Sequence, residues 1–428
     1  MIRLLRKLAR YRPGRLGQNT LFGTAGLGIR SIIQAIYLLL VSRWLGAEGY
    51  GLFAGSVALV VLGAPLANWG SALLLTRYIS EDRSRSRAMW ATALVQTGVV
   101  GGLLVVATLL ASTLLFPQRL PLFPMLLLAL SELILLPTAH AATSHCYALE
   151  RGKASATVMC LVPLGRTLAM LLAIVGGLAG TPGHAAMAHF IGSVLGLLIA
   201  MAVVAAIDGL PAWRSRLPLR DSFQQGTAYA VSNLAGTSYQ EVDKVLMLQV
   251  LGAMAAGTYT VAFRAASIFV LPISALISAT LPRLMAHRGS GTTAGTFRAV
   301  LLVALGYGLI AGMAILVAAP FMPVLFGPEY EDSSRHLALL APWPVLFALR
   351  QCFATQLTAR LRQTARTYVE IAGLVLVVVL NWIFLPLLGV KAAALALLTS
   401  EIFVSAAMWM LAVRRGSTGG RKEGSFDP

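Results

Sequence analysis

The chain has 428 residues, of which 57% are hydrophobic and 12% are charged, and its formal net charge is +18. Soluble domains carry about 25% charged residues, so the composition excludes an ordinary soluble protein. Apolar stretches of twenty or more residues recur along the chain, and about 20 such residues span a bilayer as a helix. The sequence therefore predicts an all-α integral membrane protein.

Taken in chain order, the apolar stretches predict about twelve transmembrane spans. Their ranges are 20–42, 50–76, 88–116, 122–147, 154–180, 184–207, 226–250, 257–282, 298–326, 335–359, 367–388 and 391–413. The predicted organisation is a basic cytoplasmic N-terminus, an N-lobe of spans one to six, a cytoplasmic linker, a C-lobe of spans seven to twelve and a flexible cytoplasmic tail. The corresponding residues are 1–19, 20–207, 208–225, 226–413 and 414–428.

The basic residues are distributed on one side of this predicted topology. Of the 34 Lys and Arg residues, the N-terminus, the even-numbered loops and the tail hold 25, and the odd-numbered loops hold four. The positive-inside rule then places both termini in the cytoplasm, as an even number of spans requires. The positive charge is thus a topology signal, and nucleic acid is not an expected partner.

Sequence motifs of enzymes and metal sites are missing from the chain. The three cysteines lie in predicted spans without C-x-x-C spacing, so we expect neither a disulfide framework nor a metal site. No phosphate-binding, zinc-protease or serine-hydrolase motif occurs. The basic N-terminus leads into an apolar run too long for a signal peptide, which predicts an uncleaved first span. We therefore expect a protein that is not an enzyme and needs no cofactor.

An internal repeat relates the two halves of the chain. Residues 45–77 align without gaps on residues 251–283 at a constant offset of 206. Span one then corresponds to span seven, and both run in the same direction across the membrane. The repeat therefore predicts two pseudo-symmetric six-helix lobes, an organisation typical of transporters.

The same offset relates polar faces on spans one and seven. Arg30, Gln34 and Tyr37 share one helical face, and adding 206 reaches Gly236, Gln240 and Asp243. Asn233 lies on the same predicted stripe of span seven. Equivalent polar faces on two lobes indicate a central, water-filled cleft.

Five cations lie inside the predicted spans, and each costs about 2.5–3.5 kcal/mol at a helix centre on insertion scales. They are the expected cationic lining of the cleft: Arg30, Arg166, Arg350, Arg264 and Lys244. The alternative is that some form structural ion pairs with buried carboxylates, or that Arg264 extends to the membrane surface. A guanidinium stays charged and binds phosphate in a bidentate way, which favours substrate binding for the three arginines near the middle of the membrane.

Three carboxylates within spans are candidates for coupling transport to an ion gradient. Asp243, Glu241 and Glu132 could each bind a proton or Na⁺, because burial and neighbouring cations act on their protonation in opposite senses. The sequence leaves open which of these carboxylates, if any, has that role.

Three segments resemble bacterial polysaccharide-export flippases. "SRWLGAEGYGLF" is similar to their junction between spans one and two, "EVDKVLMLQVLGAMAAGTYTVAFRAASI" resembles their seventh and eighth spans, and "VLFGPEYEDSSRHLALLAPW" resembles their link into span ten. These proteins belong to the multidrug/oligosaccharidyl-lipid/polysaccharide (MOP) superfamily. The resemblance implies the MATE-like fold of that superfamily, with two lobes and alternating access.

For the O-antigen (Wzx-type) branch, the resemblance also implies a substrate and a location. It implies flipping of undecaprenyl-pyrophosphate-linked oligosaccharides across the bacterial inner membrane for surface polysaccharide and lipopolysaccharide biosynthesis. Expected partners are the lipid bilayer, this lipid-linked substrate and polysaccharide polymerase or assembly proteins. By position, Arg30 and the polar face of span seven match the cationic cavity of the family.

Two other functions compete with flipping. A multidrug exporter of the same fold would need carboxylates in the N-lobe, where this chain offers Glu132 against Arg30 and Arg166. A non-transporting membrane scaffold of a polysaccharide-assembly complex would not need a cationic path. A lipid II flippase of the same superfamily is disfavoured, because we find twelve spans and no additional C-terminal pair.

Overall fold

The computed structural model describes residues 15–115, 117–215, 219–286, 291–360 and 362–413. The described chain is helical, and no strand occurs within these ranges. Most of the predicted basic N-terminus and all of the predicted tail at 414–428 lie outside the described residues. The chain divides into two compact units, Met1–Gly257 and Thr258–Pro428, which are described separately.

The first unit contains the helices from α2 to α10 and the first turn of α11. Their bounds are α2 (Arg15–Val61), α3 (Ala64–Ala67), α4 (Ser71–Glu81), η1 (Arg83–Arg85), α5 (Ser86–Leu115), α6 (Leu122–Leu130), η2 (Ser131–Leu135), α7 (Leu136–Ala148), α8 (Gly152–Val175), α9 (Pro182–Asp208), η3 (Trp213–Ser215) and α10 (Leu219–Leu251). Helix α2 has 47 residues, about 70 Å if straight, which is more than twice the hydrocarbon thickness of a bilayer. A non-helical residue, Gly46, breaks it.

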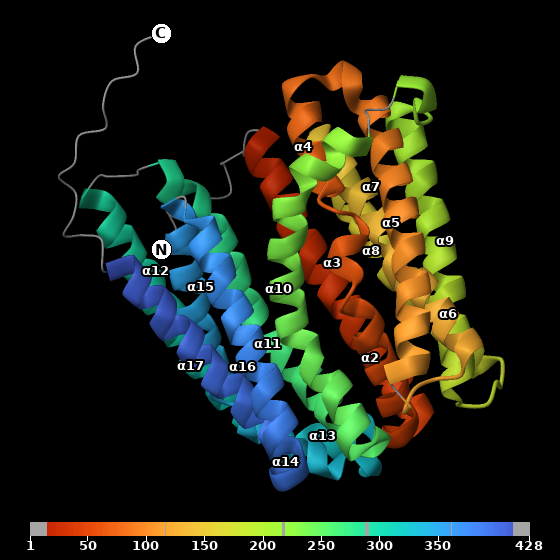
Figure 1. Ribbon diagram of the computed structural model, residues 1–428, viewed down its shortest axis with the longest axis vertical. Coiled ribbons are helices and arrows are strands. Elements are labelled where there is room, and N and C mark those ends of the chain that lie inside the picture. The colour runs from red at the N-terminus through yellow and green to blue at the C-terminus, as the bar shows by residue number, and fades with distance from the viewer. Residues whose placement is uncertain (1–14, 116, 216–218, 287–290, 361, 414–428) are drawn as a thin grey trace, which may run out of the picture. The chain divides into compact units, whose positions relative to one another are not determined.

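Small residues allow α8 to pack closely on α9, and α8 also contacts α2 (Figure 1). A Cβ on Gly192 would lie 2.4 Å from the carbonyl oxygen of Gly165, and a Cβ on Gly165 would lie 2.3 Å from that of Gly192. Gly192 and Gly196 form a G-x-x-x-G pattern, which lets membrane helices approach closely. This close approach brings polar side chains of α8 and α9 within hydrogen-bonding distance.

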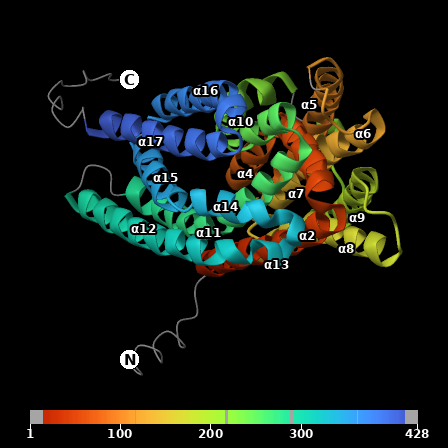
Figure 2. The ribbon, with the colours of Figure 1, turned by 90° about the horizontal axis from the view of Figure 1, so that it is seen from below.

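The second unit contains the remainder of α11 and the helices that follow it. Their bounds are α11 (Ala253–Ala286), α12 (Gly291–Ala318), η4 (Ala319–Phe321), α13 (Met322–Phe326), η5 (Pro328–Tyr330), α14 (Glu331–Leu339), α15 (Trp343–Ala359), α16 (Gln363–Leu388) and α17 (Lys391–Val413). Helix α15 contacts α12 and α17, and it lies between them in Figure 2. Buried Leu357 and Met408 pack together in a core between α15 and α17.

The described residues contain nine helices that are long and apolar enough to cross a membrane, or ten if the bent pair α14 and α15 forms one span. The predicted number is twelve. The two predicted spans that do not pass separately are the second, which begins inside α2, and the seventh, which is the polar helix α10. Many apolar side chains are exposed, including Leu114 at 79% and Val175 at 76%, as expected where lipid is the solvent. The protein is therefore a multi-pass membrane protein, and the count of twelve crossings stays a prediction.

The sequence repeat has a counterpart in the backbone of the first unit. Gly46 and Gly252, which are 206 residues apart, both have positive φ angles, 67° and 89°, a conformation that favours glycine. A Cβ on Gly51 would lie 1.8 Å from the carbonyl oxygen of Ala253, and a Cβ on Gly257 would lie 1.9 Å from that of Ala47. Ala47 and Ala253 are related by the same offset of 206 as Gly51 and Gly257, so the two contacts at the crossing of α2 and α11 are equivalent by the repeat.

The two compact units do not coincide with the predicted lobes. Helix α10, the predicted first span of the C-lobe, contacts α2, α3, α4 and α5 in the first unit. The predicted lobes, which meet at residues 208–225, are defined by the sequence repeat, whereas the compact units are defined by contacts within the chain. The division into two lobes stays a prediction.

Candidate functional site

A buried polar cluster joins four helical elements of the first unit. The cluster consists of Tyr37, Glu132, Arg166, His189 and Ser193, from α2, η2, α8 and α9. One oxygen of Glu132, Oε1, lies 2.7 Å from Arg166 Nη1 and 2.8 Å from His189 Nε2. On the other side of the imidazole ring, His189 Nδ1 lies 2.7 Å from Tyr37 Oη. We call this set the Glu132 cluster.

The guanidinium of Arg166 is only partly satisfied within the cluster. Its Nε donates to Ser193 Oγ at 2.8 Å, and Ser193 in turn donates to the carbonyl oxygen of His189 at 2.7 Å. Its Nη2 is buried, and no described group accepts a hydrogen bond from it. A buried donor without a partner costs about 1–3 kcal/mol, so Nη2 is a donor that a further oxygen atom would satisfy.

An irregular turn of helix positions Glu132. Residues Ser131–Leu135 form a π-helical turn, a feature frequent at functional sites. Pro137 follows and has no N–H, so it cannot donate to the carbonyl oxygen of Leu133. Gly101 of α5 fills this place, because a Cβ there would lie 2.3 Å from the Leu133 oxygen. Glycine and proline together thus allow α5 to pack against the turn that carries Glu132.

Arg30 and His140 surround the Glu132 cluster. Both interact electrostatically with Glu132 and Arg166. Arg30 is partly exposed, and its guanidinium forms no ion pair with a carboxylate of the described residues. With neutral imidazoles, the groups around Glu132 comprise two guanidinium cations and one carboxylate. This region therefore carries an excess positive charge.

A second charged group lies within α10. Lys244 is fully buried, and its Nζ donates to the carbonyl oxygen of Gln240, lies 3.0 Å from Asp243 Oδ1 and lies 3.7 Å from Glu241 Oε2. Lys244 thus contacts two carboxylates of its own helix. The predicted cation and two of the predicted ion-coupling candidates are brought together here.

In the second unit, Arg350 lies in a buried ion pair. Its Nε lies 2.7 Å from Glu401 Oε2, and Trp343 Nε1 donates to the other oxygen of Glu401 at 3.2 Å. Arg350 is 7% exposed and Glu401 is fully buried. The Arg350 guanidinium also lies 5.2 Å from the centre of the Phe347 ring. This geometry is what the structural alternative, an ion pair between helices, predicts.

The other predicted site residues are partly exposed or exposed. Arg264 of α11 is partly exposed, and its carbonyl oxygen accepts a hydrogen bond from Ser267. Gln34 of α2 and Asn233 of α10 are exposed. The predicted set is thus distributed over three places, with Arg30, Tyr37, Arg166 and Glu132 brought together in one of them.

Sequence reasoning missed His189, Ser193 and His140 as members of the site. The histidines appear scattered in sequence, and their common location depends on the packing of α7, α8 and α9. One signal was available on α9, where His189 and Ser193 are four residues apart and Gly192 and Gly196 mark a close helix contact.

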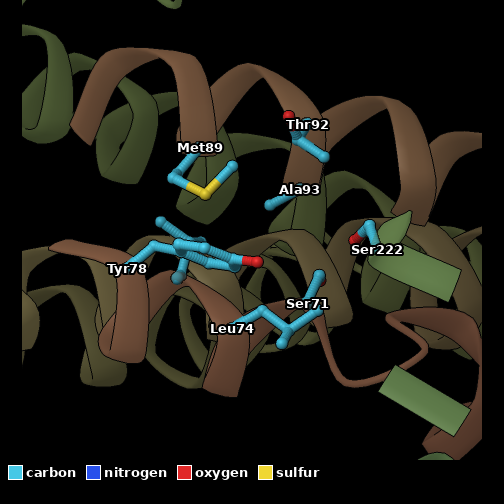
Figure 3. A pocket seen from close by; sticks show the side chains of 8 residues that line it. Ser71, Leu74, Tyr78, Met89, Thr92, Ala93 and Ser222 are labelled. Atoms are coloured by element: carbon cyan, nitrogen blue, oxygen red, sulfur yellow. The ribbon is translucent and has the colours of Figure 1, made fainter. Parts of the chain in front are cut away.

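A small hollow lies apart from the Glu132 cluster, between α4, α5 and α10 (Figure 3). Its walls carry Leu74, Tyr78, Met89 and Ser222, and no charged residue lines it. Ser222 Oγ donates to Gln96 Oε1 and Tyr78 Oη donates to Gln225 Oε1. These contacts join the start of α10 to α4 and α5, which indicates a structural role for the hollow.

Comparison with known proteins identifies the family. The sequence profile described as "Polysaccharide biosynthesis protein" matches residues 16–288, more than half of the chain. No match was found among curated protein sequences.

Solved structures similar to this one have the MATE fold. A MATE family multidrug resistance transporter of the MOP superfamily in an inward-facing conformation has a TM-score of 0.73 at 16% identity, covering 91% of this chain and 97% of that chain. The outward-facing conformation of such a transporter gives 0.67 at 16% identity, covering 94% and 96%. A MOP superfamily transporter from Pyrococcus furiosus, whose binding pocket has a reverse polarity that suggests a different function, gives 0.69 at 14% identity, covering 92% and 94%.

At these identities, the structural similarity shows the fold alone, and the family follows from the sequence profile. The solved structures that share this fold are transporters. The chain belongs to the polysaccharide biosynthesis protein family and is a membrane protein with the fold of MOP superfamily transporters.

Proposed function

We propose that this transporter flips undecaprenyl-pyrophosphate-linked oligosaccharides from the cytoplasmic to the outer leaflet of the bacterial inner membrane. In this proposal Arg30 and Arg166 bind the pyrophosphate, with polysaccharide polymerase or assembly proteins acting downstream. The observation that carries it is the positive balance around Glu132, where Arg166 pairs with the carboxylate, Arg30 interacts electrostatically with both, and Arg166 Nη2 has no described acceptor. Arginine suits a pyrophosphate because it stays charged and presents a planar set of donors.

The sign of the charge distinguishes this substrate from a cationic drug. A cation would be repelled by Arg30 and Arg166, whereas a pyrophosphate exchanges its hydration for hydrogen bonds to them. The Pyrococcus furiosus transporter of the same fold has also been linked to a different function through the polarity of its pocket. This precedent supports the use of charge to assign the substrate class.

Charge reversal tests the proposal in a bacterial strain whose own copy of the transporter is deleted. Arg30→Glu and Arg166→Glu should each abolish surface-polysaccharide export at normal protein levels. The matched control is Arg335→Glu, because the Arg335 side chain is 83% exposed and pairs only loosely with Asp332, at 3.6 Å. Normal export by both cluster variants would contradict the proposal and favour a scaffold role.

A multidrug exporter is the second candidate, and one observation favours it. The group in α10 places two buried carboxylates, Glu241 and Asp243, beside Lys244, and carboxylates are the groups that bind a cation or a coupling proton. Resistance to cationic dyes on overexpression, lost in Asp243→Asn, would support this function. If overexpression of the wild-type protein leaves dye resistance unchanged, and the same protein restores polysaccharide export in the deletion strain, the flippase function is supported.

A further inference from the structure

The contact between Glu132 and Arg166 has a consequence for the empty transporter. A transporter that binds an anion through arginine must return without its substrate, and a buried guanidinium without a counter-charge is strongly unfavourable. In the structure, Glu132 supplies that counter-charge to Arg166 at 2.7 Å. The Glu132 carboxylate therefore occupies the place at which a phosphate oxygen would bind.

We propose that Glu132 is a built-in competitor of the anionic substrate for Arg166. This inference rests on the proposed function and assigns to Glu132 a positioning role. In the empty transporter Glu132 holds Arg166, and on binding the pyrophosphate displaces the carboxylate from the guanidinium. After release of the lipid-linked product, Glu132 takes Arg166 back.

The geometry of the pair suits an exchangeable contact. Only one oxygen of Glu132 faces Arg166, through Nη1, so the bidentate arrangement typical of strong Arg–carboxylate pairs is not formed. The Nη2 group of the same guanidinium has no described acceptor. An incoming phosphate can thus bind Nη2 before Nη1 leaves Glu132, and Arg166 keeps a counter-charge throughout.

The rest of the Glu132 cluster retains the carboxylate after displacement. His189 Nε2 contacts the same Glu132 oxygen at 2.8 Å. An ionised carboxylate only accepts hydrogen bonds, so Nε2 carries the hydrogen and Nδ1 accepts from the Tyr37 hydroxyl. Ser193 holds Arg166 through Nε at 2.8 Å, an atom that is not exchanged. Both partners are therefore held in place by groups that need not move when the substrate binds.

The Arg350–Glu401 pair in the second unit lacks this arrangement. Glu401 is fully buried, and both of its oxygens are used, one by Arg350 and the other by Trp343. The side chains of Arg166 and Arg350 are similarly exposed, 12% and 9%, so exposure does not separate the pairs. Of these two pairs, the Glu132–Arg166 pair is the one with a donor, Nη2, that no described group accepts from.

A binding measurement separates this inference from the proposed function. The full-length protein in lipid nanodiscs is titrated with inorganic pyrophosphate. Glu132→Gln, which keeps the shape of the side chain and removes its charge, should bind pyrophosphate about tenfold more tightly than the wild type, the effect of one lost charged competitor. Glu81→Gln is the control, because Glu81 forms an exposed pair with Arg77 and the substitution removes the same charge.

The outcomes distinguish the two claims. If Arg166→Gln weakens binding and Glu132→Gln does not strengthen it, the competitor role is wrong and the proposed function stands. If neither Arg166→Gln nor Arg30→Gln changes the affinity, the proposed function itself fails. Glu132→Gln combined with Arg166→Gln should show no gain over Arg166→Gln alone, because the gain requires the shared guanidinium.

A flipping assay provides a readout that a purely structural role would not change. In proteoliposomes with a fluorescent prenyl-pyrophosphate-linked sugar, Glu132→Gln should lower KM and also lower kcat, because the substrate binds better and the empty transporter returns with an unpaired Arg166. A loss of folding would lower the active fraction and leave KM unchanged. An unchanged or raised KM in correctly folded protein overturns the inference.

Discussion

Arginine residues in this protein differ in role because their surroundings differ. Both carboxylate oxygens of Glu401 are bonded, one to Arg350 and the other to Trp343, whereas the Arg30 guanidinium forms no ion pair with a described carboxylate. Burial of an ion pair contributes little net stability, but removal of one partner leaves a buried charge. We therefore expect the same substitution to affect stability at Arg350 and, if the proposed function holds, transport at Arg30.

Removal of one member of the Arg350–Glu401 pair should strongly destabilise the protein. Arg350→Gln leaves Glu401 buried without its cation, at a cost of about 3–5 kcal/mol, whereas Arg350→Gln with Glu401→Gln should recover most of the loss. Thermal unfolding of the purified protein in detergent measures this double-mutant cycle. Arg30→Gln is the comparison and should leave the unfolding temperature nearly unchanged while export falls. Additive losses in the double variant would contradict a structural pair.

A turn outside the membrane spans should depend on pH through Asp82. The pKa of Asp82 is lowered because the Ser84 hydroxyl and then the Ser84 backbone N–H donate to its carboxylate, at 2.7 and 2.9 Å. A lowered folded-state pKa means that the stabilisation is present above the ordinary pKa of aspartate and is lost as the pH falls through the lowered value. A spin label at Ser80 should become more mobile at acidic pH, and Asp82→Asn should remove this pH dependence. Equal mobility changes in both proteins would argue against it.

At the scale of helices, glycines determine how closely α2 and α11 approach. Gly51 and Gly257 each lie against a carbonyl oxygen of the facing helix, and the two contacts are related by the sequence offset of 206. A single methyl group at either position would lie well inside the van der Waals contact distance to that oxygen. The crossing can therefore persist only with glycine at both positions.

Alanine at either glycine should force the two helices apart. Gly51→Ala and Gly257→Ala should each lower the unfolding temperature, and the double variant should lose less than the sum because the first methyl group already separates the helices. Gly98→Ala is the control, since nothing lies within 4 Å of a Cβ at that position on α5. Alanine is there the better helix former by about 1 kcal/mol. Unchanged unfolding temperatures in the crossing variants would show that the helices adjust freely.

The sequence predicts most of the helices, because long apolar runs are a strong signal, and the all-α fold of the MOP superfamily is confirmed. Two predicted spans are less simple in the structure: the second is broken after Val61 at the turn before α3, and the seventh is too polar to qualify by hydropathy. The reciprocal glycines were visible as identities in the repeat, but their contact was not.

The candidate site could be predicted only in part. Arg30, Arg166 and Glu132 could be predicted because a charged side chain within a membrane span is costly in lipid and is therefore a candidate for a functional or pairing role. The pairing of Glu132 with Arg166 rather than with another cation depends on the π-helical turn and on close packing of α8 and α9. His189 was missed because the two histidines of α9, His184 and His189, are not at helical spacing from each other and so did not mark a site.

At the scale of the whole molecule, the distribution of charge relates the chain to its membrane. The predicted loops divide 25 to four in Lys and Arg content, and five further cations lie within predicted spans. The division of 25 to four concerns orientation, and the five cations within spans concern the cost of charged side chains in lipid. Both sets contribute to the same net charge of +18, although they act through different physics.

Orientation follows from this asymmetry and can be measured with reporter fusions. Green fluorescent protein fused after residue 413 should fluoresce, because it folds in the cytoplasm, and alkaline phosphatase inserted between α8 and α9 should be active, because that predicted outer loop carries no Lys or Arg. Insertion of the phosphatase between α7 and α8, beside Arg151 and Lys153, should give an inactive enzyme.

Basic residues in short loops determine orientation. Arg151→Gln combined with Lys153→Gln should remove the topology signal of this loop without inverting the protein, since the other cytoplasmic loops retain their basic residues. Phosphatase activity at residue 413 would mean an odd number of crossings and would overturn both the topology and the twelve-span prediction.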